Sequence, residues 1–242
     1  MSGVSPRRGL SAAALKGIAL VSMTLDHFAA SGLYLLLAVR FGGTGEGYLP
    51  LRLVGRLAFP IYCFLLTEGF RHTRSRRRYA LRLGLFALLS EVPFDLVCSG
   101  AAYDRTQQNV FFTLLLGLLA LMAAEPLLQK GKRWQAFAAA LAFALAAEVL
   151  RTDYGFFGVA LIVVLHVLRD RETEKYLLGG TLLLGLGSME IAAWPSFLLM
   201  HGYNGRRGAG GAALKWLFYL YYPAHLLLFA WLAGVVSASL VY

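Results

Sequence analysis

Asp26 and His27 stand side by side inside a long apolar stretch, and their side chains suit proton transfer. A charge near the centre of a bilayer costs at least about 2.5–3.5 kcal/mol, so such residues usually have partners or a function. Histidine can accept and return a proton near neutral pH, as a general base must. Neighbours on a helix point about 100° apart, so Asp26 need not orient His27. We take His27 as the candidate base; the alternative is a histidine that only hydrogen-bonds a neighbouring helix.

A second set of ionisable groups lies further along the chain. Glu91 and Asp95 are four residues apart and share one helix face, and Pro93 opens the helix hydrogen-bond ladder between them. Paired carboxylates could carry out acid–base work or simply bind an arginine. Arg56 could form an ion pair with Asp26 or Glu91, or it could snorkel from the start of its span. We expect Asp26 and Glu91 to tune or hold the catalytic site.

The last polar segment combines a turn signal with paired arginines. It reads Tyr203-Asn204-Gly205-Arg206-Arg207-Gly208. Asn-Gly favours a turn, and arginines beside glycines can approach a phosphate or carboxylate closely. His225 follows in the next apolar stretch, after Pro223. A re-entrant loop and a helix kink would explain these residues without any chemistry. Asn109, at the head of an earlier stretch, fits a helix N-cap.

The composition is that of an integral membrane protein. The 242 residues are 58% hydrophobic and 15% charged, whereas soluble domains are about 45–50% apolar and about 25% charged. Backbone groups in a bilayer must be hydrogen-bonded internally, so helices are the expected spanning form. Cys63 and Cys98 show no metal-ligand spacing, so we expect no metal site. The whole chain, residues 1–242, is expected to form one membrane domain.

Apolar stretches long enough to cross a bilayer recur along the chain. We predict an all-α fold, a polytopic membrane helix bundle with about eight transmembrane helices. The spans lie roughly at 11–38, 52–70, 79–99, 109–128, 134–150, 154–169, 176–200 and 213–236. The seventh contains Trp194-Pro195, so it is either kinked or made of two half-helices.

The net charge of +10 follows membrane topology rather than nucleic-acid binding. The basic residues gather mainly in the segments 7–16, 71–82 and 130–133. With eight spans these segments fall on one side, which the positive-inside rule makes cytoplasmic. Arg206 and Arg207 contradict this pattern, because parity places them outside. Either the span count near Trp194-Pro195 is wrong by one, or these arginines serve another purpose.

The basic run that contains Arg74 and Arg78 has two compatible interpretations. It satisfies the positive-inside rule and contacts anionic lipid, and it could also receive a polyanion such as the phosphates of coenzyme A.

The order of these motifs resembles the TraX family, which is named for a conjugal-transfer protein that acetylates the N-terminus of pilin. The similarity runs from about residue 15 to about 230. The motifs that carry it are Asp26-His27, Gly55-Arg56-Leu57-Ala58-Phe59-Pro60, Glu68-Gly69-Phe70, Glu91-Val92-Pro93-Phe94-Asp95, Asn109, Asp153-Tyr154-Gly155, Tyr203-Asn204-Gly205 and Tyr222-Pro223-Ala224-His225.

The opening of the chain also resembles the first helix of the wider membrane acyltransferase superfamily. There, a basic residue and Gly-Ile-Ala lead to a catalytic histidine, which matches His27. The resemblance implies a cytoplasmic acyl-coenzyme A donor and an acceptor often modified on the far side of the membrane. It links donor binding to arginines near the cytoplasmic face, to which Arg74 and Arg78 are loose counterparts.

The leading hypothesis is an acyltransferase of the bacterial inner membrane that moves an acetyl group from acetyl-CoA to a hydroxyl or amine of a surface peptide or glycan. His27 would act as base or carry the acyl group itself. The expected donor-binding arginines are Arg56, Arg74, Arg78, Arg206 and Arg207. The residues expected to contact the acceptor or support the site are Asp95, Asn109, Tyr203, Asn204 and His225. A proton-coupled transporter and a non-catalytic assembly factor of a surface appendage are the alternatives.

Overall fold

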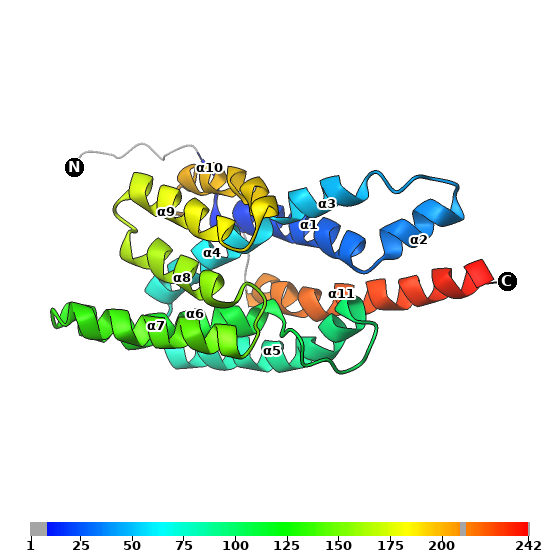
Figure 1. Ribbon diagram of the computed structural model, residues 1–242. Coiled ribbons are helices and arrows are strands. Elements are labelled where there is room, and N and C mark those ends of the chain that lie inside the picture. The colour runs from blue at the N-terminus through cyan, green and yellow to red at the C-terminus, as the bar shows by residue number, and fades with distance from the viewer. Residues whose placement is uncertain (1–8, 209–211, 242) are drawn as a thin grey trace.

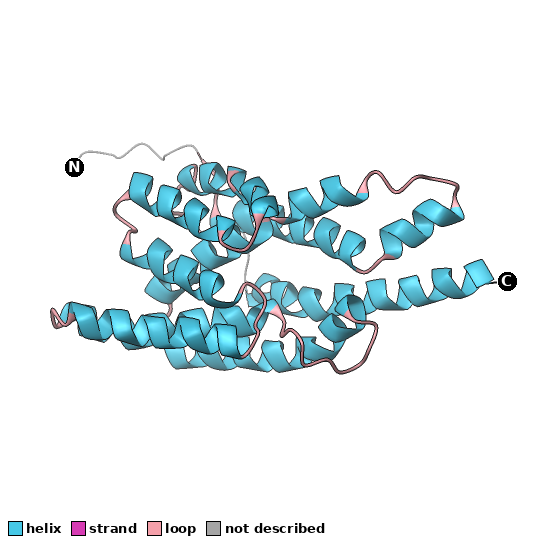
Figure 2. Ribbon diagram, viewed as in Figure 1, coloured by secondary structure: helices cyan, strands magenta, loops and turns pink. Residues whose placement is uncertain are grey.

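A computed structural model describes residues 9–208 and 212–241, and this part of the chain is helical without a β-strand (Figure 2). The elements are α1 (Ala12–Ala30), α2 (Leu33–Arg40), α3 (Tyr48–Gly55), α4 (Ala58–His72), α5 (Arg76–Cys98), α6 (Val110–Gln129), α7 (Arg133–Val149), α8 (Gly155–Val167), α9 (Glu172–Leu184), the 3₁₀ helix η1 (Ser188–Ala193), α10 (Pro195–His201) and α11 (Ala212–Val241). The predicted all-α class is correct.

The helices form an elongated bundle in which α5, α6, α7 and α11 run side by side along its length (Figure 1). Helices α4 and α8 pack on α6, and α1 packs on α3 and α4. The core lies where these elements meet, at fully buried side chains such as Leu15, Ile61, Phe70, Leu118 and Leu161. This packing holds α1, which carries the candidate base, against α3 and α4, and α1 also contacts α11.

The number of membrane spans is smaller than predicted when length and composition are the criteria. Three helical segments of the described chain meet both: Tyr48–His72, Val110–Gln129 and Trp216–Leu240. A fourth is added if α1 and α2, bent by 62° at a short break, count as one span. Helix α8 is apolar but only 13 residues long, and α5 begins with three arginines. The prediction of about eight spans is therefore not confirmed, although helices occupy every predicted stretch.

The predicted seventh span is not one helix but a helical hairpin. Helix α9 ends at Leu184, η1 follows, and α10 begins with Pro195 at its first position. Residues at the start of α9 meet the end of α10: Glu172 lies 2.9 Å from His201, and the Tyr176 ring stands 6.3 Å from the His201 ring. The chain therefore reverses direction within a segment that we expected to cross the bundle once.

This hairpin explains the misplaced arginines. It returns the chain to the N-terminal end of α1, where the Leu10 N–H donates to the Gly202 carbonyl at 2.8 Å. The first N–H groups of α1, those of Ala12 and Ala13, donate to the carbonyls of Arg206 and Arg207 at 2.9 and 3.0 Å. The break at Pro195 reverses the chain rather than kinking it, so Arg206 and Arg207 lie at the same end as the start of α1.

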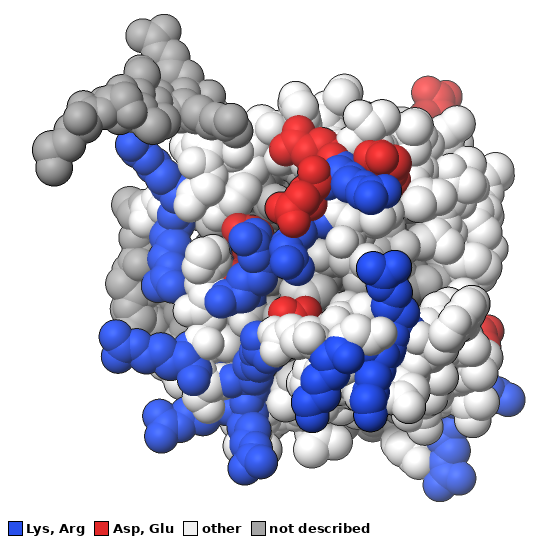
Figure 3. All heavy atoms as spheres, turned by 90° about the vertical axis from the view of Figure 1, so that its left-hand side faces the viewer, with Lys and Arg blue, Asp and Glu red and all other residues white. Residues whose placement is uncertain are grey.

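One end of the bundle is strongly basic. Figure 3 looks at this end and shows Lys and Arg spread over the face, with Asp and Glu gathered in one part of it. The α6–α7 and α8–α9 turns lie there (Figure 1). Lys16, His72, Arg82 and Arg207 meet around one cavity at this end. Arg7 and Arg8, from the first basic segment, lie outside the described residues.

Candidate functional site

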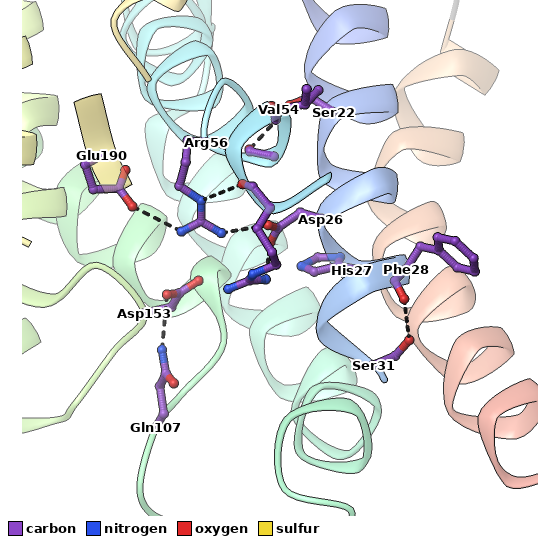
Figure 4. Close-up of polar contacts among 12 residues, drawn as sticks. Ser22, Asp26, His27, Phe28, Ser31, Val54, Arg56, Gln107, Asp153 and Glu190 are labelled. Carbon is purple, nitrogen blue, oxygen red and sulfur yellow. Dashed lines mark hydrogen bonds and ion pairs between the residues drawn. The ribbon is translucent and has the colours of Figure 1, made fainter. Parts of the chain in front are cut away.

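An ion-pair cluster surrounds Asp26 (Figure 4). The Asp26 carboxylate binds Arg52 through Oδ2 at 2.9 Å and Arg56 through Oδ1 at 2.7 Å. The second Arg56 nitrogen binds Glu190 of η1 at 3.1 Å. Arg56 and Glu190 side chains are 14% and 8% exposed, so water screens this pair little. The predicted ion pair between Arg56 and Asp26 is confirmed, while Glu91 takes no part in it.

Local sequence accounts for this cluster. Ser22 and Asp26 are four residues apart on the buried face of α1, and the Ser22 hydroxyl donates to the Val54 carbonyl at 2.5 Å. Gly55 lies so close to the Asp26 carboxylate that any side chain there would collide with it. Arg52 and Arg56 are also four apart, which puts both guanidinium groups on the face that meets Asp26. The cluster fastens α1 to the α3–α4 junction and to η1.

Asp153, in the α7–α8 connection, lies beside the cluster (Figure 4). The Gln107 amide donates to its carboxylate at 3.1 Å. Burial raises the pKa of the Asp153 carboxyl to about 7, and the nearby Arg56 guanidinium opposes that rise. This carboxyl therefore changes charge near neutral pH, unlike an ordinary aspartate.

His27 faces a different partner, His225 of α11. Nδ1 of His27 lies 2.7 Å from Nε2 of His225, and Nδ1 of His225 lies 2.7 Å from the Tyr221 carbonyl oxygen. The two imidazole rings stack with centroids 4.9 Å apart, and the Tyr222 ring meets His27 edge-on at 5.6 Å. Helix α11 therefore orients His27, and Asp26 does not.

The hydrogen-bond pattern assigns the tautomers of both rings. A carbonyl oxygen only accepts, so Nδ1 of His225 must carry a hydrogen. In the neutral ring, Nε2 of His225 then holds a lone pair and accepts from Nδ1–H of His27. The basic nitrogen of His27 is consequently Nε2, which has no hydrogen-bond partner among the described residues. This is the arrangement a general base requires.

A cavity of about 600 Å³ leads from the basic end toward these rings. Its wall includes Lys16, Arg82 and Arg207 and, in the interior, apolar side chains such as Leu66 and Leu114. Met23, one helical turn before His27, and Tyr222, the ring that touches His27, also line it, whereas His27 and His225 themselves do not. A ligand with an anionic head and an apolar or uncharged arm fits this distribution.

The carboxylates of α5 hold loops and helix ends. Glu91 accepts hydrogen bonds from the side-chain amide and the backbone N–H of Asn109. Asn109 caps α6, since its Oδ1 accepts from the Phe111 N–H at 3.0 Å, which confirms the predicted N-cap. The buried Asp95 accepts from the Asp104 N–H at 2.9 Å. Neither carboxylate has an arginine partner among the described residues.

The remaining predicted residues lie at the basic end. Arg207 lines the 600 Å³ cavity, whereas Arg74, Arg78 and Arg206 are exposed and do not line it. Tyr203 lines this cavity and packs edge-on against the Phe64 ring at 5.3 Å.

Asn204 forms the predicted turn by accepting from the Arg206 N–H at 2.9 Å. Its amide also donates to the Gly9 carbonyl at 2.9 Å. This residue therefore fixes the loop against the N-terminal segment.

The ion-pair cluster and the 600 Å³ cavity also contain charged residues that were not among the predicted site residues, including Lys16, Arg52, Glu68, Arg82 and Glu190. The four-residue spacing of Arg52 and Arg56 was a readable signal. Glu190 gave none, because it lies inside the segment interpreted as a continuous span. Lys16 and Arg82 sit near helix starts, where basic residues are ordinarily explained by membrane topology.

Comparison with known proteins agrees with the order of motifs. The family model described as TraX protein matches residues 11–233. The chain is 36% identical over 244 residues to a probable fimbrial assembly protein, FimC of serogroup H1, from Dichelobacter nodosus. That alignment covers 90% of this chain and 93% of the relative. No solved structure matches the chain. With a family match over nearly its whole length, the protein belongs to the TraX family.

Proposed function

We propose that this protein is an acyltransferase of the bacterial inner membrane that transfers an acetyl group from acetyl-CoA to an amine or hydroxyl of a surface acceptor. The observation that carries the proposal is Nε2 of His27, which has no hydrogen-bond partner among the described residues and belongs to a ring held by His225. This ring packs on Tyr222, which lines a cavity with a basic mouth. The cavity is large enough for the reacting arm of a coenzyme.

The proposed chemistry is direct transfer with His27 as general base. Nε2 of His27 removes the proton from the acceptor amine or hydroxyl as it attacks the thioester carbonyl. The tetrahedral intermediate collapses, the carbon–sulfur bond breaks, and the imidazolium returns its proton to the coenzyme A thiolate. His225 stabilises the imidazolium by accepting from Nδ1–H throughout.

The same atom could instead take the acyl group itself. In that case Nε2 attacks the thioester carbonyl, the carbon–sulfur bond breaks and coenzyme A leaves as its thiolate, so an acyl-histidine forms before the acceptor arrives. The acceptor then attacks this acyl group, Nε2 is released, and the acceptor's proton goes to the coenzyme A thiolate.

The donor would enter from the basic end. Lys16, Arg82 and Arg207 at the cavity wall would meet its phosphates, and the pantetheine arm would follow the apolar interior toward Met23. Arg56 is not assigned to the donor, because two carboxylates already bind its guanidinium. In this orientation the basic end faces the cytoplasm, as the positive-inside rule expects.

The family supports the proposal at a coarser level. The TraX resemblance implies acetylation of a pilin N-terminus, and the Dichelobacter nodosus relative is named for fimbrial assembly. Both indicate a membrane protein that acts on pilin-type subunits. The relative's name also favours a second candidate function, a non-catalytic assembly factor whose polar cluster only joins helices.

Release of coenzyme A from acetyl-CoA by the purified protein in nanodiscs separates these candidates. We expect slow turnover by wild type and a loss of roughly 10²–10⁴-fold in His27→Ala, as for removal of a general base. His201→Ala is the matched control, because His201 is exposed at the basic end and lies outside the donor cavity.

Three outcomes would count against the proposal. Equal turnover in His27→Ala and wild type would remove the role of His27. No acetyl-CoA binding by folded wild type would favour the assembly factor. Substrate flux without thioester cleavage would favour a transporter.

A further inference from the structure

A second, smaller cavity of about 230 Å³ opens at the basic end between α4, α8, α9 and the loop after α10. Glu68 and Tyr203 line both this cavity and the donor cavity, so the two share a wall. The charged or titratable side chains around it are Glu68, Arg71, His166, Arg169, Glu172 and Lys175. The proposed transfer reaction uses none of them.

Lys175 is a buried cation in this cavity without an anionic partner. The residue is 5% exposed, and no carboxylate lies within ion-pair distance of its amine in the described part of the chain. Its Nζ donates to the Arg169 carbonyl at 3.3 Å and stands 4.6 Å from the centroid of the Tyr176 ring. An ammonium group has three N–H donors, so two remain for a ligand. Glu172, Glu68 and Asp170 stabilise this charge from a distance without touching the amine, so an anion in the cavity can accept from the free N–H groups.

His166 also lines this cavity. It is 3% exposed, and Nε2 lies 2.9 Å from the Glu125 carboxylate. Nδ1 has no hydrogen-bond partner in the described structure, but it is fully buried and is not presented to the cavity. The groups that the cavity offers to a ligand are therefore N–H donors.

The carboxylates at the rim attract Lys175 from a distance but do not touch its amine. Glu68 is bound by Arg71 at 2.9 Å, and Glu172 by His201 at 2.9 Å. Among the described residues Arg169 forms an ion pair with Asp170, at 3.5 Å, and Asp170 is 86% exposed, so solvent weakens that pair. Lys175 and Arg169 therefore keep N–H donors for a ligand.

We propose that this cavity binds a phosphate monoester group. Such a group has three negative or partly negative oxygens that can accept from the free N–H groups of Lys175 and from Arg169. A carboxylate has only two oxygens for these donors, and the volume suits a head group rather than a whole nucleotide. The group could come from the 3′-phosphate of coenzyme A, from phosphatidic acid or from free phosphate. If the phosphate group belongs to coenzyme A, the inference rests on the proposed function. If it belongs to phosphatidic acid or is free phosphate, the inference is independent of that function.

The test measures binding of three probes to the full-length protein in phosphatidylcholine nanodiscs. Adenosine 3′,5′-bisphosphate and inorganic phosphate are titrated by calorimetry, and nanodiscs containing phosphatidic acid are compared by thermal unfolding. We expect at least one probe to bind wild type, with affinity reduced roughly tenfold or more in Lys175→Met. Lys175→Arg should recover part of the affinity. Lys130→Met, at an exposed lysine of the same end, should match wild type.

The three probes also identify which molecule supplies the phosphate group. Binding of the bisphosphate in competition with acetyl-CoA assigns the site to the donor, and stabilisation by phosphatidic acid alone assigns it to lipid. Either result supports the phosphate site. Equal binding of all probes to wild type and Lys175→Met would overturn it, even if acetyl-CoA turnover were normal.

A measurement on the wild-type protein covers the case in which the variant fails to fold. Modification of Lys175 by an amine-reactive reagent is followed by mass spectrometry, with Lys130 as internal reference. We expect the bound probe to protect Lys175 and leave Lys130 unchanged. Equal modification of Lys175 with and without every probe would contradict the proposal.

Discussion

Asp26 and His27 are neighbours on one turn of α1, yet their surroundings are opposite. Asp26 faces a closed cluster in which both carboxylate oxygens bind arginines, and Arg56 continues to Glu190. His27 is hydrogen-bonded on one side only: one ring nitrogen binds His225, and the other has no partner among the described residues. Helical geometry separates the two directions by about 100°.

This contrast separates stability from reactivity. The carboxylate of Asp26 has no oxygen left for a substrate, so we assign it to holding α1 against the α3–α4 junction. The imidazole of His27 is oriented on one side and available on the other, which fits a base beside a cavity. Ionisable residues inside a bilayer thus need not share a purpose, even when they are adjacent in sequence.

The largest expected effect comes from breaking the closed cluster. Arg56→Met leaves Glu190 as an uncompensated buried charge and removes one of the two arginine partners of Asp26, which should cost about 3–5 kcal/mol of stability. Thermal or denaturant unfolding in detergent measures the loss. Adding Glu190→Gln should recover part of it, because Asp26 keeps Arg52 as its partner and the unpaired carboxylate is gone. A fully stable Arg56→Met variant would show that the cluster does not hold the fold.

Breaking the hydrogen bond between His27 and His225 should change the reaction rate rather than the stability of the fold. His225→Phe keeps a ring in place but removes the acceptor for Nδ1–H of His27. A hydrogen bond to a charged group contributes about 1.5–3 kcal/mol, so kcat should fall roughly 10- to 150-fold. The KM for acetyl-CoA should stay near the wild-type value, because His225 does not line the donor cavity. An unchanged kcat would mean that His225 does not support the base.

A smaller effect, on the KM for acetyl-CoA, is expected from changes in the basic wall of the donor cavity. Arg207→Ala removes a guanidinium that lines the cavity, and the KM for acetyl-CoA should rise roughly two- to fivefold, as for an exposed charge contact. Arg78→Ala is the matched control, since Arg78 is exposed and does not line the cavity. Equal effects in both variants would point to a general electrostatic attraction of the donor to the basic end.

The last prediction concerns pH and the edge of the closed cluster. The pKa of Asp153 is about 7 in the folded protein, well above that of an ordinary aspartate. The folded state therefore binds a proton that the unfolded state has lost between about pH 4 and 7. The contribution of Asp153 to stability decreases as pH rises through that interval.

Asp153→Asn should remove this slope. Unfolding midpoints at pH 5 and pH 8 should show the variant gaining relative to wild type at the higher pH. A parallel pH dependence in both proteins would contradict the raised pKa.

The sequence alone identified the positions of most helices and several local roles. Long apolar stretches predict helices because bilayer backbone must be hydrogen-bonded within the chain. The N-cap role of Asn109 and the turn at Asn204 follow from contacts within a few residues. For Arg56 the sequence offered Asp26 and Glu91 as ion-pair partners, and the structure shows Asp26. A buried charge requires a partner, but the sequence does not determine which residue that is.

Only the tertiary structure decided how distant segments meet. The hairpin of α9, η1 and α10 was missed because an apolar stretch containing Trp194-Pro195 has the same composition whether it kinks or reverses. His27 and His225 are 198 positions apart, and no local pattern pairs them. Periodicity and propensity describe what a segment can bury, whereas packing of whole helices decides which partner it buries against. The candidate base could therefore be identified from the sequence. Which nitrogen of His27 is free to react could be identified only from the tertiary structure.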